Sequence, residues 1–274
     1  MCYNIGTTVL IYNKKLVKEA PKSWSVLWDE QYRDKVLMFN NSRDAFALAQ
    51  FMLGQDLNTT SEEDWNAAAE LLAKQKDAVR PVYVMDEVFN LMESGEYAFA
   101  TYYAGDYILM QDNNPDLGCC FPEEGVNLFY DAMCVPKCTQ NKKGAEAFIN
   151  FVSRPDNAVR NMYYIGYTSV IAGGDDDTVY SYLDYTYGAE DDEEDVVDYP
   201  LGYFFTGDNS DPDYVLRAPA EQVNRQLGAQ YPSQDAIERS AVMEYFDEDA
   251  TKDINQMWIN IRCYNIKDVP TWAW

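Results

Sequence analysis

Carboxylates that stand next to aromatic or polar turn residues are the side chains of this sequence best suited to chemistry. Asp44 follows the extended apolar run 35–39 and the polar turn Asn40-Asn41-Ser42, and it opens an amphipathic stretch. Open α/β sheets place ligands where a strand passes through short polar residues to a helix N-terminus. The turn is therefore a candidate binding site, although Asp44 also fits the simpler role of partner to an Asn41 helix cap.

Two further segments place rings beside acids: TYYAGD at 101–106 and PEEGVNLFYD at 122–131. A flexible alkyl-ammonium ligand needs carboxylates for its ammonium groups and flat rings for its methylenes, with cation–π attraction in addition. Asp44 and Asp131 with their aromatic neighbours supply both. The alternative for Tyr102 and Tyr103 is packing in the core.

Catalysis has little support in this sequence. The chain contains no histidine, which excludes Ser-His-Asp and Cys-His arrangements, and it has neither a GxSxG motif nor a phosphate-binding glycine loop. A carboxylate pair for glycoside hydrolysis remains an alternative, but no spacing singles one out. We expect a binding protein without catalytic residues or a cofactor.

The charge balance narrows the class of partner. The chain has 46 acidic and 21 basic residues, for a formal net charge of −25. This balance argues against nucleic acid and favours a cationic ligand, although an acidic surface also serves solubility alone. No apolar run approaches the roughly 18 residues that a membrane span requires.

Metal sites are also poorly supported. Six cysteines occur without a CxxC pair or a histidine, so we expect buried free thiols and no zinc, with a Cys134–Cys138 bridge left open. The acidic runs within 173–213 predict solvated loops. A calcium site is the alternative for these acidic runs, since clustered carboxylates suit this ion, but their spacing fits no EF-hand loop.

Alternating strand and helix patterns predict an α/β fold with a mostly parallel, helix-covered sheet. Strands are expected at 7–12, 35–39, 82–84, 97–103, 117–121 and 127–135. Helices are expected at 28–32, 43–53, from a Thr60 or Ser61 cap to about 75, and at 86–94, 106–111, 144–152, 233–244 and 251–261.

Eight collinear blocks between residues 6 and 261 carry a resemblance to a known family. They include GTTVLIYNKKLV (6–17), SRDAF (42–46), NPDLGCCFPEEGVNLFYDAMCVPK (114–137) and YIGYTS (164–169). In their order the blocks resemble the spermidine/putrescine-binding proteins of bacterial ABC importers, which are extracytoplasmic solute-binding proteins. The resemblance implies a periplasmic-binding-protein-like, two-lobe (venus-flytrap) α/β fold that closes on one polyamine and delivers it to ABC transporter permease subunits.

The resemblance also implies a set of ligand contacts. The positions that align with polyamine-contacting residues of the family are Asn41, Asp44, Tyr103, Phe129, Asp131 and Tyr167. An acid often stands in the family where Asn41 stands here, and tryptophans stand where Tyr103 and Phe129 stand. We expect these departures to weaken ammonium binding or to shift the preference among polyamines.

The family normally has roughly a hundred residues before the block that begins here at Gly6, enough for half a lobe. In the family they carry the signal or anchor, which is not present in this chain, and several ligand contacts. The resemblance thus implies a truncated form with one lobe incomplete: 12–128 and 173–274 form the complete lobe, and 1–11 and 129–172 remain of the other. Unpaired strand edges and an exposed apolar face would follow, and we expect the isolated chain to bind polyamine weakly or not at all.

Two other functions stay open. The chain fits a sensor or interaction module that kept the fold and lost polyamine binding. Three features depart from the family pattern: Asn41, Phe129 and the lack of the family's N-terminal residues before Gly6. Tyr163 and Tyr164 resemble the tyrosine pairs of ferric-ion-binding proteins, since phenolates are hard oxygen donors for iron(III).

Overall fold

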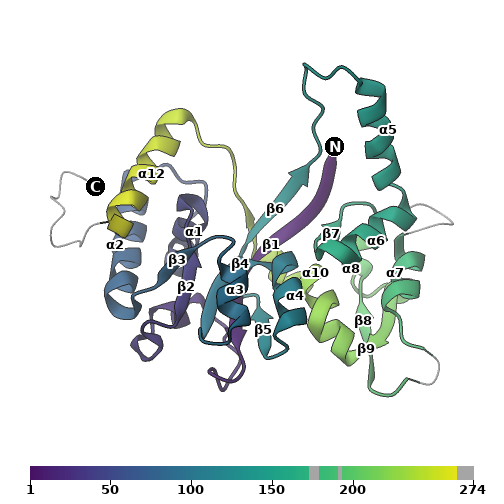
Figure 1. Cartoon of the computed structure of the whole chain (residues 1–274), viewed down its shortest axis with the longest axis horizontal. Helices are drawn as coiled ribbons and strands as arrows, with labels where there is room; N and C mark the ends of the chain where they lie inside the picture. Colours follow the sequence, from purple (N-terminus) through teal and green to yellow (C-terminus); the bar gives the residue numbers. More distant parts are fainter. Residues whose placement is uncertain (173–178, 191–192, 264–274) are drawn as a thin grey trace. The chain divides into compact units, whose positions relative to one another are not determined.

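The structure is a computed structural model that describes residues 1–172, 179–190 and 193–263 (Figure 1). Two compact units are present. Unit 1 comprises Met1–Thr7, Ala104–Leu109 and Phe129–Asp235, and unit 2 comprises Thr8–Tyr103, Met110–Leu128 and the chain from Ala236 onward. Strands β1 (Cys2–Asn13) and β6 (Asn127–Ala132) each contribute residues to both units.

Unit 2 is built on a mixed sheet. β4 (Phe99–Tyr103) runs parallel to β2 (Val36–Phe39) and antiparallel to β1, while β3 (Val82–Val84) is parallel to β2. β5 (Leu117–Cys120) is antiparallel to β1, and β10 (Ala241–Val242) is parallel to the first residues of β6. Three of these five strand pairs are parallel, as expected, and the two that involve β1 are antiparallel, because local strand-helix alternation does not fix the direction in which distant strands pair.

Helices cover this sheet with the expected caps. α1 (Ser42–Leu53) begins at Asn41, whose side-chain oxygen accepts a hydrogen bond from the Asp44 backbone N–H, and it ends at Gly54 in the left-handed region. α2 (Glu62–Val79) begins at the Ser61 cap. α3 (Val88–Glu93) and α12 (Glu248–Cys263) complete the unit, and the helix predicted at 28–32 consists of two short 3₁₀ segments, Trp24–Trp28 and Glu30–Tyr32.

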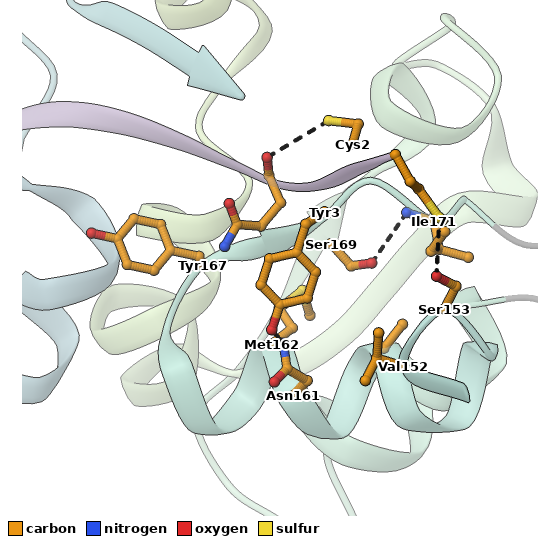
Figure 2. Close-up of a pocket in the computed structure, with 12 residues that line it drawn as sticks. Cys2, Tyr3, Val152, Ser153, Asn161, Met162, Tyr167, Ser169 and Ile171 are labelled. Atoms are coloured by element: carbon orange, nitrogen blue, oxygen red, sulfur yellow. Dashed lines mark hydrogen bonds between the residues drawn. The ribbon is translucent and has the colours of Figure 1, made fainter. Parts of the chain in front are cut away.

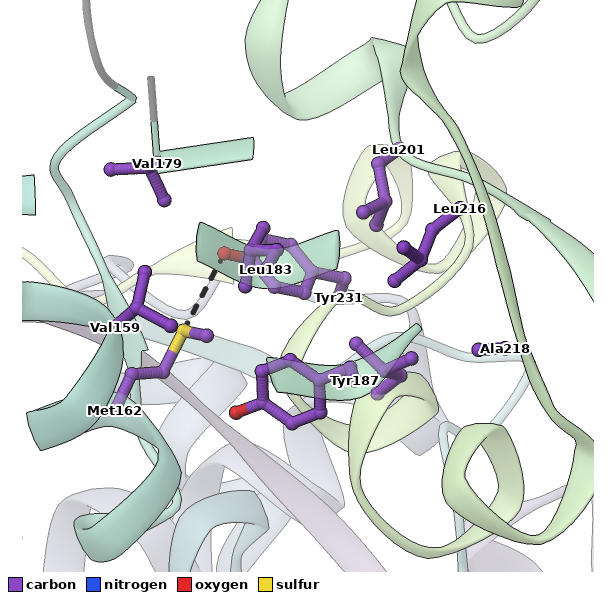
Figure 3. Close-up of a cluster of buried hydrophobic side chains, with 10 residues drawn as sticks. Val159, Met162, Val179, Leu183, Tyr187, Leu201, Leu216, Ala218 and Tyr231 are labelled. Carbon is purple, nitrogen blue, oxygen red and sulfur yellow. Dashed lines mark hydrogen bonds between the residues drawn. The ribbon is translucent and has the colours of Figure 1, made fainter. Parts of the chain in front are cut away.

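Unit 1 combines a small sheet with a second core. In its sheet, β7 (Thr168–Ser169) pairs with Asn4 and Ile5 of β1, and β6 lies next to β1. α4 (Ala104–Asn113) contributes its first residues, and α5 (Lys142–Val152) precedes α6 (Pro155–Ile165). Figure 3 shows Val159 and Met162 of α6 in a buried cluster with residues of α7 (Val179–Tyr187) and with Leu216 and Ala218 of β9 (Val215–Pro219). β9 pairs antiparallel with β8 (Val196–Pro200).

The acidic segment is more ordered than expected. α7 forms between the two charge runs, and β8 and α8 (Gly202–Phe205) form after the second run, because Leu183, Tyr187 and Leu201 are buried in the core of unit 1. The acidic positions 175–177 and 191–192 lie outside the described residues. The helix predicted at 233–244 is only α11 (Gln234–Glu238), followed by β10, and the remaining short helices span Pro212–Tyr214, Ala220–Gln222, Val223–Leu227 and Gly228–Gln230.

The compact units differ from the expected lobes in two short segments, 8–11 in unit 2 and Ala104–Leu109 in unit 1, and in one long segment. The expected lobe of 12–128 included everything from residue 173 onward, whereas the chain up to Asp235 belongs to unit 1. The reason is the shared core, since Val159 and Met162 from the expected smaller lobe pack with Leu183, Tyr187 and Tyr231.

All six cysteines are free, so the structure contains no Cys134–Cys138 bridge, and Cys134, Cys138 and Cys263 are exposed rather than buried. None of the described helices combines the length and the apolar character needed to cross a membrane.

Candidate functional site

The Asp44 carboxylate is the centre of the candidate site in unit 2. Its side chain is only 6 % exposed. The Tyr103 hydroxyl donates to Oδ2 at 2.8 Å, Asn41 Nδ2 donates to the same oxygen, and Asn127 Nδ2 lies 3.4 Å from Oδ1. The structure therefore brings together three of the six predicted residues and adds Asn127.

Local structure explains why these side chains meet. The N-cap turn of α1 holds the Asn41 and Asp44 side chains next to each other, since Asn41 Oδ1 also accepts a hydrogen bond from the Asp44 backbone N–H at 2.9 Å. Tyr103 is the last residue of β4, and Asn127 is the first residue of β6, held by its backbone N–H to Thr8 Oγ1 at 3.1 Å. The sequence reasoning did not name Asn127, although it lies within the PEEGVNLFYD segment that had been singled out.

Asn127 leaves an acceptor unused. The residue is 6 % exposed, and its Oδ1 is buried without a hydrogen-bond partner in the described chain. An unsatisfied buried oxygen costs free energy, typically about 1–3 kcal/mol. The site therefore offers a cationic donor a carboxylate and a neutral oxygen close together.

Aromatic rings line the same region. The Tyr103 ring lies 5.3 Å from the ring of Phe39 and 4.9 Å from the ring of Tyr102, between centroids. Tyr102 is buried, and its hydroxyl donates to Asp86, which makes it a packing residue. Tyr103 is only half-buried and remains the ring that a ligand can approach.

No basic side chain pairs with Asp44 among the ion pairs of the described residues. The neighbouring Arg43 turns away: its guanidinium lies 3.5 Å above the Phe246 ring, and it donates to the Glu244 and Leu57 carbonyls. Burial lowers the pKa of Arg43, an effect that the nearby Asp44 charge partly opposes. Asp44 is thus a buried carboxylate held by neutral donors, an arrangement suited to receiving a cation.

A second group of predicted residues lies in unit 1. The rings of Phe129 and Tyr167 are 6.2 Å apart, and the Tyr167 hydroxyl donates to Asp106 Oδ2 at 2.8 Å. Two glycines allow this packing, because a Cβ on Gly6 would lie 2.2 Å from Phe129 Cζ and one on Gly105 would lie 2.5 Å from Tyr167 Cδ2. Asp106 was not predicted as a site residue, although it belongs to the TYYAGD segment.

Asp131 is more exposed than the residues around Asp44 and than the Phe129–Tyr167 pair. It is exposed on β6, two residues after Phe129, so both side chains belong to the same face of the strand. The structure adds no contact that assigns it a role.

A small pocket in unit 1 adjoins the Phe129 and Tyr167 group (Figure 2). Its lining includes Asn4, Tyr167 and Ser169, and the Tyr3 hydroxyl at its wall accepts from Asn161 Nδ2 at 2.5 Å. Asn4 is buried, and its Oδ1 has no hydrogen-bond partner within the described chain. The pocket is large enough for about one water molecule.

The metal alternatives gain no support from the part of the chain that is described. It holds no group of three or more histidine, cysteine or acidic side chains that is placed to bind an ion. The Tyr163 ring packs against Tyr187 with 5.6 Å between centroids, whereas Tyr164 is largely exposed on the same helix.

Comparison with known proteins identifies the family. The profile described as bacterial extracellular solute-binding protein matches residues 1–181, and the chain belongs to this family. Its members bind solutes and are not enzymes, and its fold is the α/β fold of periplasmic binding proteins. The family, the fold class and the absence of enzymatic activity predicted from the sequence are thereby confirmed.

Individual relatives are consistent with this assignment. The spermidine/putrescine-binding periplasmic protein of Salmonella typhimurium is 31 % identical over 166 residues, which cover 60 % of this chain and 47 % of that protein. The norspermidine sensor of Vibrio cholerae is 29 % identical over 172 residues, with 60 % and 47 % covered. The chain spans about half the length of these curated relatives.

Solved structures support the fold. The spermidine/putrescine ABC transporter substrate-binding protein PotD from Streptococcus pneumoniae superposes with a TM-score of 0.72 at 24 % identity, covering 97 % of this chain and 69 % of that one. A spermidine/putrescine ABC transporter protein from Listeria monocytogenes gives a TM-score of 0.69 at 24 % identity, with 96 % and 68 % covered.

Proposed function

We propose that this chain recognises a polyamine as part of an extracytoplasmic solute-binding protein that serves an ABC importer. Several relatives bear the names of spermidine- and putrescine-binding proteins. We further propose that units 1 and 2 correspond to the two lobes implied by the sequence blocks, with the segment up to Asp235 assigned to unit 1.

The observation that carries this proposal is the state of Asp44. A carboxylate that is 6 % exposed has lost most of its hydration, and its partners Tyr103, Asn41 and Asn127 are all neutral. A buried charge without a counter-ion is costly, and a bound ammonium group supplies that counter-ion. The side chain is therefore better explained by a cationic ligand than by helix capping alone.

The surroundings of Asp44 fit the remaining chemistry of a polyamine. An ammonium group donates up to three hydrogen bonds, and Asp44 together with Asn127 Oδ1 offers acceptors for them. The half-buried ring of Tyr103, backed by Phe39, suits the adjacent methylene groups. Phe129, Tyr167 and Asp131 are proposed as further contacts, to be tested separately.

Calorimetric titration of the 274-residue chain with spermidine tests this function. Since the chain spans about half the length of its curated relatives, we expect weak binding, with a Kd of about 0.1–1 mM. Asp44→Asn should weaken it at least about tenfold, and Asp77→Asn, which removes the same charge from an exposed position on α2, should not. Equal effects of the two variants would refute the proposed role of Asp44, and micromolar binding would overturn the expectation of weak or absent binding.

A second candidate is a sensor, and the similarity to the norspermidine sensor of Vibrio cholerae favours it specifically. The importer component and a module that has lost its ligand differ in their response to Asp131→Asn. If the chain binds polyamine through Asp131, the Asp131→Asn variant loses affinity. If the chain is a module that does not bind polyamine, neither the native chain nor the variant gives any heat of titration. Norspermidine in parallel with spermidine establishes which of the two the chain prefers.

A further inference from the structure

A helical segment of unit 1, residues 220–230, buries two glutamines. The segment contains a π turn, Val223–Leu227, and such turns are frequent at functional sites. Gln226 is 1 % exposed and Gln230 is 5 % exposed, and their spacing of four residues places them on one face. Burying an amide is costly unless it is hydrogen-bonded, so the partners of these two side chains indicate what they do.

Both amides donate to carbonyl oxygens at the C-terminal end of α6. Gln230 Nε2 donates to Met162 O at 3.0 Å, and Gln226 Nε2 donates to Tyr163 O at 3.2 Å. The last four carbonyls of an α-helix have no partner within the helix, and these are two of the four in α6. The glutamines therefore hold the last turn of α6 in place.

The amide oxygens are bonded as well. The Tyr187 hydroxyl donates to Gln230 Oε1 at 3.1 Å, and Arg225 donates to Gln226 Oε1 at 3.1 Å. Each nitrogen and each oxygen of the two amides thus has at least one partner. A buried network in which every member is satisfied is rigid, and it specifies one arrangement of the segments that it joins.

The chain that leaves α6 carries Tyr167, one of the proposed ligand contacts. α6 ends at Gly166, whose φ of +81° lies in the left-handed region, and a Cβ there would lie 2.3 Å from Gly105 O. After Tyr167, the Thr168 hydroxyl donates to the backbone carbonyl of Gln230. Gln230 therefore holds the chain on both sides of Tyr167, by its side chain before it and by its backbone after it.

The orientation of the Tyr167 ring depends on this turn. The hydroxyl donates to Asp106 Oδ2 at 2.8 Å, and a Cβ on Gly105 would lie 2.5 Å from ring atom Cδ2. Hydrogen bonds between two oxygens span only about 2.5–3.0 Å. A displacement of the turn by about 1 Å would therefore break the bond to Asp106 or move the ring away from Gly105.

We propose that Gln226 and Gln230 are positioning residues that hold Tyr167 in the orientation in which its ring contacts the ligand. They act through the end of α6 and through Thr168. Both lie beyond residues 1–181, which the family profile matches, so the profile assigns them no role. For the identity of the ligand we rely on the proposed function, whereas the orientation of Tyr167 can be observed without any ligand.

The first test observes Tyr167 in the ligand-free chain. Gln230→Met keeps the length of the side chain and removes its two amide hydrogen bonds. With ¹³C at the tyrosine Cζ, the resonance that Tyr167→Phe removes is that of Tyr167. In Gln230→Met it should move toward the resonance of the exposed Tyr185, because the phenol–carboxylate bond weakens. Gln140→Met removes an exposed amide of the same unit and should leave the resonance unchanged.

Two milder variants keep this test decisive if Gln230→Met does not fold. Gln226→Met removes only the bonds of the other amide, and Thr168→Val removes only the hydroxyl that donates to Gln230. Each should shift the Tyr167 resonance in the same direction. A Tyr167 resonance that stays in place in every folded variant overturns the proposal.

The second test separates positioning from a purely structural role. Calorimetric titration with spermidine should show that Gln230→Met weakens binding about fivefold in the native background and not at all in a Tyr167→Leu background. Urea denaturation should show that the same change destabilises the protein in both backgrounds. Equal weakening of binding in both backgrounds overturns the proposal. If the native chain gives no heat with spermidine, that result concerns the proposed function alone, and the Tyr167 resonance decides the positioning role.

Discussion

The Tyr103 hydroxyl donates a 2.8 Å hydrogen bond to Asp44 Oδ2, joining the end of β4 to the first turn of α1. The acceptor is a buried carboxylate, and hydrogen bonds to charged groups contribute more than those between neutral groups. This bond therefore links the stability of unit 2 to the geometry of the proposed ammonium site.

Tyr103→Phe keeps the ring and removes only the hydroxyl. We expect the free energy of unfolding to fall by about 1.5–3 kcal/mol, because the carboxylate loses a donor that water replaces poorly in a buried site. Urea denaturation measures the change. Tyr245→Phe, at an exposed position of unit 2, serves as the control, and an equal effect of both variants would show that the bond contributes nothing.

Asn41→Asp restores the acid that the family often has at this position. The new carboxylate still caps α1, but it replaces the Nδ2 donor to Asp44 with a second negative charge. We expect a loss of about 1–2 kcal/mol in the stability of the free protein. Spermidine affinity should rise roughly fivefold, since the ligand gains a second nearby carboxylate.

Thermal unfolding with and without spermidine measures both effects of Asn41→Asp. Asn90→Asp adds the same charge at an exposed position of α3 and should change neither quantity. A lower spermidine affinity in Asn41→Asp than in the native chain would contradict the proposed role of this turn.

Gly6→Ala tests the packing of Phe129 in unit 1. The added Cβ would lie 2.2 Å from Phe129 Cζ, so the ring must move. We expect a destabilisation of about 1–3 kcal/mol, as for other overpacked positions. In a Phe129→Ala background the same change should cost much less, and a double-mutant cycle in chemical denaturation reports the coupling. Additive effects would exclude the contact.

Stability at high pH should depend on the buried tyrosines of unit 1. Burial raises the pKa of Tyr199 to about 12, and it raises the pKa values of Tyr187 and Tyr231 as well. The neutral phenol is the form that the folded state accommodates, so its contribution is complete below the unfolded pKa near 10 and is lost as pH rises toward the folded values.

The free energy of unfolding should therefore fall on raising the pH above about 10, by on the order of 1 kcal/mol per pH unit for each of these buried phenols. Urea denaturation at several pH values measures the slope. Tyr199→Phe should reduce it, whereas Tyr185→Phe, which alters an exposed phenol, should leave it unchanged. A slope that is identical in all three proteins would contradict the assignment to buried phenols.

The rate at which each cysteine reacts with a thiol reagent should follow the exposure of its side chain. Cys134, Cys138 and Cys263 are exposed, and we expect them to react rapidly with a disulfide reagent at pH 8. Cys120 should react at least about tenfold more slowly, because burial raises the pKa of its thiol and less thiolate forms. Mass spectrometry of peptides after timed labelling distinguishes the sites, and fast modification of Cys120 would show that its strand opens readily.

Sequence patterns predicted much of the local structure. Asn41 and Ser61 cap the helices that their side chains predict, and the apolar run at 36–39 forms a strand that is buried throughout. These features depend on neighbours within a few residues, so the order of residues is sufficient to determine them. The collinear blocks likewise identified the family, which the profile over residues 1–181 confirms.

Other features depend on residues that are distant in the sequence, and only the tertiary structure decides them. Asn127 meets Asp44 across 83 residues, and Tyr187, which lies between the acidic runs, packs against Tyr163 of α6, so neither arrangement has a local signal. Whether neighbouring strands run parallel or antiparallel also depends on distant residues, because β1 and β4 pair across about 90 residues. The sequence alone determined the residue types that suit an alkyl-ammonium ligand, and the fold decided that Asp44 is buried with no ion pair to a described basic side chain, while Asp131 is exposed. The physical reason is that burial depends on which distant segments pack together, and periodicity along the chain does not specify them.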